Sequence, residues 1–152
     1  MSKNRITDIN DFLAQKKLAV VGASRSQNKF GNVVFRELKQ RNYQVFPINS
    51  QAKTIEGVPC WPDLKSLPEP VDGAVFVVPP AVTEHVVKDA KEAGIPRIWM
   101  QYGSHSQDAV DFCKENNMTV VANECIMMFA EPVGSFHKFH RWLWKLFRIY
   151  PK

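Results

Sequence analysis

Residues 18–41 read LAVVGASRSQNKFGNVVFRELKQR, and this stretch decides the fold class of the chain. The apolar run from Leu18 to Val21 stops at Gly22, which is typical of a buried parallel strand that ends in a sharp turn. From Lys29 to Arg41 apolar residues recur at a spacing near 3.6, which predicts a helix. A strand, a turn of small residues and a helix in this order indicate the first unit of a parallel α/β sheet.

The rest of the chain continues the alternation of strands and helices. Further strands are expected at residues 43–49, 73–78, 97–101 and 118–123, and further helices at residues 6–17, around 82–90, after a capping box formed by Ser104 and Gln107, and at about 134–148. This order predicts an α/β fold, a Rossmann-like, three-layer, doubly wound parallel sheet of about five strands in the order 3-2-1-4-5. Residues 1–152 are expected to form a single domain.

Composition restricts the classes of protein to which the chain can belong. Of its 152 residues 45% are apolar and 23% are charged, which is ordinary for a globular domain. No apolar run is long enough to span a membrane, and the polar N-terminus does not resemble a secretory signal, so a cytoplasmic location is expected. The three scattered cysteines, Cys60, Cys113 and Cys125, argue against a disulfide framework and a structural zinc site. The net charge of +5 suits an anionic partner.

The ligand of an open parallel sheet binds beyond the carboxyl ends of its strands, where the strand order reverses. In the expected order this place lies between the first and fourth strands. Gly22 there allows a sharp turn, and Ala23 and Ser24 are small enough for the backbone to approach a ligand. Main-chain N–H groups from Gly22 to Ser24 and the start of the following helix can then hold phosphate oxygens, with Arg25 and Lys29 as cations. The alternative is a plain turn with solvated charges.

Two better-known phosphate motifs are excluded by the residues of this turn. It lacks the GK[ST] ending of an NTPase loop and the second and third glycines of GxGxxG. After the second strand no acid precedes Glu56, which disfavours the ribose of NAD. A phosphorylated ribose near Lys53 is compatible with the sequence, and both NADP and coenzyme A (CoA) carry one.

The chain resembles the small CoA-binding-domain proteins, which are related in fold to the N-terminal domain of the succinyl-CoA synthetase α subunit. The residues that carry the resemblance run in family order from Leu18 to Met127: Val21-Gly22-Ala23-Ser24 with Lys29 and Gly31, Val45-Phe46-Pro47-Ile48-Asn49, Ile55-Glu56-Gly57, Leu67-Pro68, Val71-Asp72, Val77-Val78-Pro79-Pro80, Ile98-Trp99-Met100-Gln101-Tyr102-Gly103 and Cys125-Ile126-Met127. The resemblance implies that the first turn holds CoA phosphates, that residues after the second strand reach the ribose phosphate, and that Val78-Pro79-Pro80 packs near the adenosine.

These arguments together define the candidate cofactor-binding residues. They are Gly22, Ala23, Ser24, Arg25, Lys29, Gly31, Asn49, Ser50, Lys53, Val78, Pro79, Pro80, Gln101, Tyr102 and Gly103. No catalytic residue and no metal ligand is expected, because the four histidines (His85, His105, His137 and His140) do not match the catalytic context of the synthetases. The leading hypothesis is non-catalytic binding of CoA or an acyl-CoA. The alternatives are an NADP-binding redox protein or sensor, and a protein-interaction module with a vestigial nucleotide site.

Two features lie outside these arguments. Cys125 follows the fifth strand, where its thiol can either form a mixed disulfide with CoA or remain a buried free thiol. The helix at about 134–148 is aromatic and basic, and its apolar stripe is expected to pack against the domain's own core, a second copy of the chain or a protein partner. A role at a membrane surface or on nucleic acid is less favoured.

Overall fold

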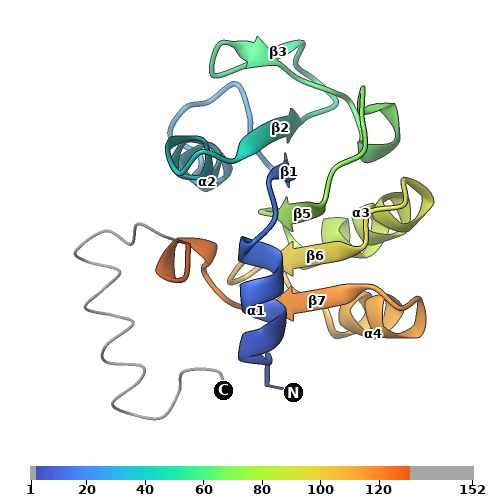
Figure 1. Ribbon diagram of the computed structural model, residues 1–152. Coiled ribbons are helices and arrows are strands. Elements are labelled where there is room, and N and C mark those ends of the chain that lie inside the picture. Colours follow the sequence, from blue (N-terminus) through green and yellow to red (C-terminus); the bar gives the residue numbers. More distant parts are fainter. Residues whose placement is uncertain (1–2, 131–152) are drawn as a thin grey trace.

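A computed structural model describes residues 3–130, which form a five-stranded parallel sheet with helices on both faces (Figure 1). The sheet strands are β1 (Lys17–Val21), β2 (Gln44–Ile48), β5 (Gly73–Phe76), β6 (Arg97–Met100) and β7 (Thr119–Ala122). The helices are α1 (Ile6–Leu13), α2 (Phe30–Gln40), α3 (Pro80–Glu92) and α4 (Gln107–Glu115). Two short antiparallel strands, β3 (Thr54–Ile55) and β4 (Val58–Pro59), form a hairpin, and η1 (Leu64–Ser66) and η2 (Ile126–Met128) are 3-10 turns.

The core is divided into two layers because alternate residues of each strand face opposite sides of the sheet. In β1, Leu18 and Val20 pack with residues of α1, α2 and η2, whereas Val21 packs with residues of α3 and α4. Trp99 of β6 is fully buried, and its ring centroid lies 5.4 Å from that of Phe12 in α1. Since helices cover both faces, the inner strands β1, β5 and β6 are buried and apolar after their first residue.

The predicted α/β class with a doubly wound parallel sheet is confirmed, but the strand order is different. Counted along the chain, the five strands lie in the order 2-1-3-4-5 (β2-β1-β5-β6-β7), not 3-2-1-4-5. Pro47 in β2 has no N–H for a second ladder and therefore suits an edge strand. All four residues of β5 are buried, as a central strand requires. The strand order therefore reverses between β1 and β5.

Asp72 fixes the pairing of β5 with β1. Its carboxylate accepts hydrogen bonds from the N–H groups of Lys16 and Lys17, at 3.1 and 2.9 Å, and its own N–H donates to the Lys17 carbonyl at 2.8 Å. These bonds hold the two strand entrances in register, with Leu18 opposite Gly73. The bonds to the charged form lower the pKa of the Asp72 carboxyl, with the Lys17 N–H as the largest cause.

The outer edge of β2 is partly covered by the segment that follows β4. The Trp61 N–H donates to the Pro47 carbonyl at 3.1 Å, and the Asn49 N–H donates to the Trp61 carbonyl at 2.8 Å. The Trp61 ring packs on that of Phe46, with centroids 5.4 Å apart. Pro47 thus presents its carbonyl, and no donor, to this edge.

The expected capping box before α4 is wrong. The helix begins after Ser106, whose side chain makes no capping bond, and the Ser104 hydroxyl instead accepts from the Val78 N–H at 3.1 Å. Ser104 instead joins the loop after β6 to the loop after β5, and the local sequence does not indicate this contact. The helix expected at about 134–148 lies outside the described residues.

None of the helices described between residues 3 and 130 combines the length and the apolar character needed to cross a bilayer. The expected cytoplasmic location and the expected single domain over residues 1–152 stay predictions.

We expect Asp72→Asn to lower the free energy of unfolding by about 1 kcal/mol at pH 7, since it weakens hydrogen bonds to a charged acceptor. The folded-state pKa of Asp72 is depressed, so its charge stabilises the fold above the unfolded pKa of about 4, and this contribution is lost as pH falls through the folded pKa. Urea unfolding at pH 7 and pH 3 should therefore show a smaller difference from wild type at pH 3. Asp111→Asn, at an exposed position of α4, serves as the control and should have little effect at either pH. An equal loss for both variants at pH 7 would contradict the assignment.

Candidate functional site

A pocket of about 320 Å³ opens at the carboxyl ends of β1 and β2 and at Val78, which follows β5, beside α3 and η1. It therefore lies at the reversal of strand order, where ligands of such sheets bind. Its lining comprises Val21, Gly22, Ala23, Ser24, Ile48, Asn49, Ser50, Gln51, Pro62, Asp63, Leu64, Val78, Val82, Val86 and Asp89. Six of the expected residues are among them: Gly22, Ala23, Ser24, Asn49, Ser50 and Val78.

The turn between β1 and α2 is built on two glycines. Gly22 has a φ of 119°, and a Cβ there would lie 2.1 Å from the carbonyl oxygen of Val77. A Cβ at Gly31, in the first turn of α2, would lie 2.2 Å from the carbonyl oxygen of Gly22. Both contacts are with backbone, which cannot move aside as a flexible side chain can. Only glycine therefore allows α2 to begin this close to the end of β1.

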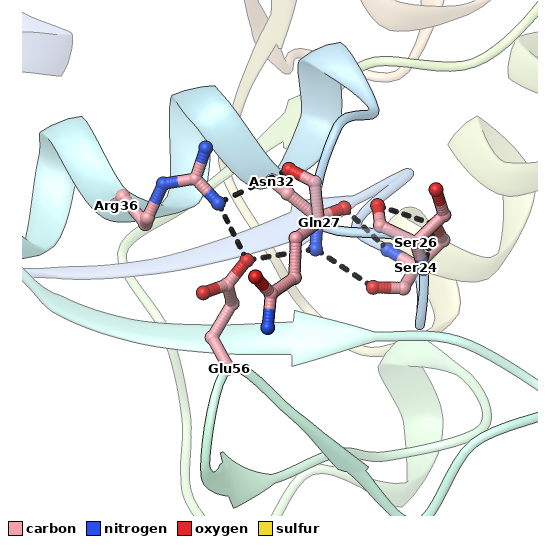
Figure 2. A network of polar contacts seen from close by, with 6 residues as sticks. All are labelled: Ser24, Ser26, Gln27, Asn32, Arg36 and Glu56. Carbon is pink, nitrogen blue, oxygen red and sulfur yellow. Dashed lines mark hydrogen bonds and ion pairs between the residues drawn. The ribbon is translucent and has the colours of Figure 1, made fainter.

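The backbone of Ser24 is held by the side chain of Asn32, which is fully buried in α2 (Figure 2). The Ser24 N–H donates to Oδ1 of Asn32 at 2.8 Å, and Nδ2 of Asn32 donates to the Ser24 carbonyl at 2.7 Å. The Ser24 hydroxyl also stays within the turn, because it accepts from the Ser26 N–H at 3.1 Å. The expectation that the Ser24 amide faces a ligand is therefore wrong, since an internal acceptor occupies it.

Further N–H donors lie later in the turn. In the described part of the chain, the N–H groups of Arg25, Gln27 and Asn28 make no hydrogen bond. The side chains of Arg25 and Lys29 are exposed next to them. The turn can thus offer amide donors and cations to an anion, but from residues 25–29 and not from Ser24.

Glu56, in the turn of the β3–β4 hairpin, completes the network in Figure 2. Its Oε1 accepts from Nδ2 of Asn32 at 3.0 Å and from Nη1 of Arg36 at 2.7 Å. The same Nη1 donates to the Gln27 carbonyl at 3.1 Å. Asn32 and Arg36 were not expected at the site, since both sit inside the helical pattern of α2.

Asn49 ties the end of β2 to the same turn. Its Nδ2 donates to the Ala23 carbonyl at 2.9 Å, and its Oδ1 accepts from the Gln51 N–H at 2.7 Å. Lys53, expected near a ribose phosphate, is exposed and does not line the pocket.

Ser104 holds the loop between β5 and α3, which contributes Val78 to the pocket. In addition to its bond with the Val78 N–H, its carbonyl accepts from the Thr83 hydroxyl at 2.7 Å, inside the first turns of α3. Pro80 opens α3 at a position where a missing N–H is harmless, and Pro79 precedes it, both exposed and outside the lining.

The remaining expected residues, at the end of β6, lie outside the lining of this pocket. Gln101 is buried, and its Oε1 accepts from the Ile126 N–H at 2.7 Å, so it supports the β7–η2 segment. Tyr102 is 73% exposed. Gln101, Tyr102 and Gly103 were selected because the expected strand order placed β6 next to β1, where the structure has β5.

The pocket lining combines apolar side chains with two carboxylates. Asp63 accepts from the Ser66 N–H at 2.9 Å and caps η1, and Asp89 lies 3.6 Å from Nζ of Lys65. Leu64 on η1 and Val82 and Val86 on α3 supply apolar surface. These residues were missed because an apolar stripe on a helix looks the same in sequence whether it faces a core or a pocket.

The cysteines lie apart from the pocket lining. Burial raises the pKa of Cys60, and it raises that of Cys113 to about 12, so both remain neutral thiols near pH 7. The Sγ of Cys125 accepts from Nε2 of Gln101 at 3.7 Å. Among residues 3–130 there is no cluster of three or more His, Cys, Asp or Glu arranged to hold a metal ion. His85 is exposed and His105 half-buried, while His137 and His140 lie outside the described residues.

A larger hollow, of about 730 Å³, lies along the outer edge of β7 between the segment that precedes α1 and helix α4. None of the expected binding residues lines it, and it is at the opposite edge of the sheet from β2.

Comparison with known proteins finds relatives both among CoA ligases and among small proteins of similar fold. An ADP-forming acetate–CoA ligase of Archaeoglobus fulgidus is 28% identical over 136 residues, which are 83% of this chain and 20% of the ligase. A conserved hypothetical protein of Pyrococcus furiosus has a solved structure with 37% identity and a TM-score of 0.70, covering 73% of this chain and 96% of that one. A hypothetical protein of Pyrococcus horikoshii is 29% identical, with a TM-score of 0.76 and coverage of 84% and 94%.

The chain thus spans a fifth of the ligase it matches and nearly the whole length of the two small proteins. None of the three comparisons supports the NADP-binding alternative or the interaction module with a vestigial site. Residues 16–131 match the family described as CoA binding domain, which covers most of the chain and the whole of the pocket described above. The expected resemblance is therefore confirmed, and the chain belongs to the CoA binding domain family.

Proposed function

We propose that this chain binds coenzyme A or an acyl-CoA in the pocket between the β1–α2 turn and α3, and that it does so without catalysing a reaction. The observation that carries the proposal is the position of the pocket. It lies where the strand order reverses, and its floor is a glycine-built turn followed by free amides. Membership of the CoA binding domain family supports CoA as the ligand.

The apolar part of the pocket suits the adenine ring of CoA. The apolar lining of the pocket comprises Ile48, Leu64, Val78, Val82 and Val86. The carboxylates of the pocket can accept hydrogen bonds from an exocyclic amine, which adenine carries. The ring and its ribose would thus lie between α3 and η1.

The diphosphate of CoA then lies at the turn, next to the free N–H groups of Arg25, Gln27 and Asn28. The first turn of α2 follows these residues directly in the chain, and the positive end of the helix dipole favours an anion there. Arg25 and Lys29 add two exposed cations, and their attraction for the diphosphate is screened by salt. Affinity is expected to fall as the salt concentration rises.

The absence of catalysis is part of the proposal. Of the described residues that line the pocket, none is His, Cys or Lys, and Asp63 and Asp89 are engaged with Ser66 and Lys65. The polar groups of this pocket are thus arranged to bind and not to transfer protons or acyl groups. The proposed homodimer or protein partner of the residues after 130 stays a prediction.

CoA should raise the unfolding temperature of the purified chain, because a ligand that binds only the folded state stabilises it by about 2.7 kcal/mol at a hundred times its Kd. ADP, which shares the adenine and the diphosphate, should compete with CoA and stabilise less. Pantetheine, which lacks both, should have no effect. Thermal-shift and calorimetric titrations with the three ligands measure this order, and a chain that responds to neither CoA nor ADP would rule out the proposal.

Gly31→Ala should both destabilise the chain and weaken CoA binding. At an unobstructed helix position alanine is favoured over glycine by about 1 kcal/mol. Here its methyl group would meet the Gly22 carbonyl, so we expect a net loss of about 2 kcal/mol from overpacking and a displaced turn. Urea unfolding and CoA titration test this, with Gln40→Ala at the exposed end of α2 as the control. A variant more stable than wild type, with the same affinity for CoA, would contradict the close contact.

A further inference from the structure

Glu56 occupies a backbone conformation that glutamate rarely adopts. It is the first residue of the two-residue turn between β3 and β4, with a φ of 53°, and Gly57 follows with a φ of 77°. A turn with two positive φ angles favours Asn or Gly at its first position. The turn itself therefore does not explain a glutamate at residue 56, and the contacts of its side chain become the relevant observation.

The Glu56 carboxylate points back to α2 (Figure 2), where its side chain is only 14% exposed. It accepts hydrogen bonds from both Asn32 and Arg36, through the single oxygen Oε1. A residue of the hairpin thus contacts two residues of the helix that follows the phosphate-binding turn. Glu56 and Asn32 are 24 residues apart in the chain, yet the carboxylate joins the hairpin to the helix that follows the turn.

The carboxylate also reinforces the orientation in which the Asn32 amide contacts Ser24. An asparagine side chain can turn over and exchange its oxygen for its NH₂ group. An ionised carboxylate only accepts hydrogen bonds, so Glu56 requires the NH₂ group of Asn32 on its side. In that orientation Oδ1 faces the Ser24 N–H and Nδ2 also reaches the Ser24 carbonyl.

The hydrogen bond from Asn32 to the Ser24 carbonyl also determines the direction of the Arg25 N–H. A trans peptide unit is planar, with its C=O and the following N–H pointing in opposite directions. The Ser24 carbonyl faces Asn32, so the Arg25 N–H points away from Asn32. The Gln27 carbonyl faces Arg36, so by the same geometry the Asn28 N–H points away from Arg36. The N–H groups of Arg25 and Asn28 are therefore oriented by a network that Glu56 anchors.

We propose that Glu56 is a positioning residue for the diphosphate of the ligand: it orients Asn32 and Arg36, and these orient the amides of Arg25 and Asn28. This inference rests on the proposed function and adds to it the residue that prepares the turn for phosphate. Glu56 does not line the pocket and touches no ligand itself.

The decisive variant is Glu56→Asn, because asparagine suits the positive φ of the turn but is too short to reach Asn32. Glu56→Gln keeps an oxygen acceptor for Asn32 and removes only the charge. Glu69→Gln is the matched control, since Glu69 accepts from Lys17 and Gln44 near the opposite ends of β1 and β2. Affinities for CoA, ADP and adenosine are measured by calorimetry or by NMR titration, alongside the unfolding temperature.

Glu56→Asn should keep the unfolding temperature of wild type and weaken CoA and ADP binding about tenfold, as expected for one charge-assisted hydrogen bond. Adenosine, which has no phosphate, should bind as it does to wild type. Glu56→Gln should recover most of the CoA affinity, and Glu69→Gln should match wild type for all three ligands.

Three outcomes would overturn the inference. If wild type binds CoA and Glu56→Asn binds it equally well, the positioning role is wrong while the proposed function stands. If Glu56→Asn weakens adenosine as much as CoA, its effect is a general loss of the pocket and not an aiming of amides. If wild type binds neither CoA nor ADP, the proposed function fails and this inference fails with it.

Discussion

Three segments of backbone meet at the end of β1 with no room for a side chain between them. A methyl group at Gly22 would collide with the carbonyl of Val77, and one at Gly31 would collide with the carbonyl of Gly22 itself. The end of β5 and the first turn of α2 are thus as close to the β1–α2 turn as backbone atoms permit. The pocket depends on this contact. The close packing places the N-terminus of α2 and the β5–α3 connection next to the β1–α2 turn.

The tight contact explains why the polar network is needed. A turn packed against backbone on two sides has peptide groups that cannot all reach water, and a buried peptide group without a partner is costly. Asn32 and Asn49 satisfy the peptide groups of Ser24 and Ala23 with side chains, so no second strand has to cover the turn. The exposed side of the turn keeps its remaining donors for a ligand. Some peptide groups of the turn are therefore hydrogen-bonded within the protein, while those of neighbouring residues can bind a ligand.

The elements of the fold follow from local patterns, whereas their order does not. The periodicities of residues 18–41 predict β1 and α2 because each repeat is complete within a few residues. The pairing of β5 with β1 depends on bonds between Asp72 and residues 55 or more positions earlier, which no local repeat contains. The β1–α2 turn was located correctly because its pattern is local, whereas Gln101 was selected from a strand order that depends on such distant contacts. Val82 was left out because its helical pattern does not distinguish a core from a pocket. Asn32 was hidden because a buried amide interrupts the apolar pattern of α2 at one position only.

Pro47 has a consequence for how copies of this chain can meet. An uncovered edge strand offers alternate N–H and C=O groups, onto which an extended segment of another molecule can add as a further strand and begin a fibril. In β2, Pro47 has no N–H to donate, and its carbonyl already accepts a hydrogen bond from the Trp61 N–H. The sheet therefore cannot continue past this edge with a regular ladder. Pro47 thus opposes the addition of a strand from another molecule at the rim beside the pocket.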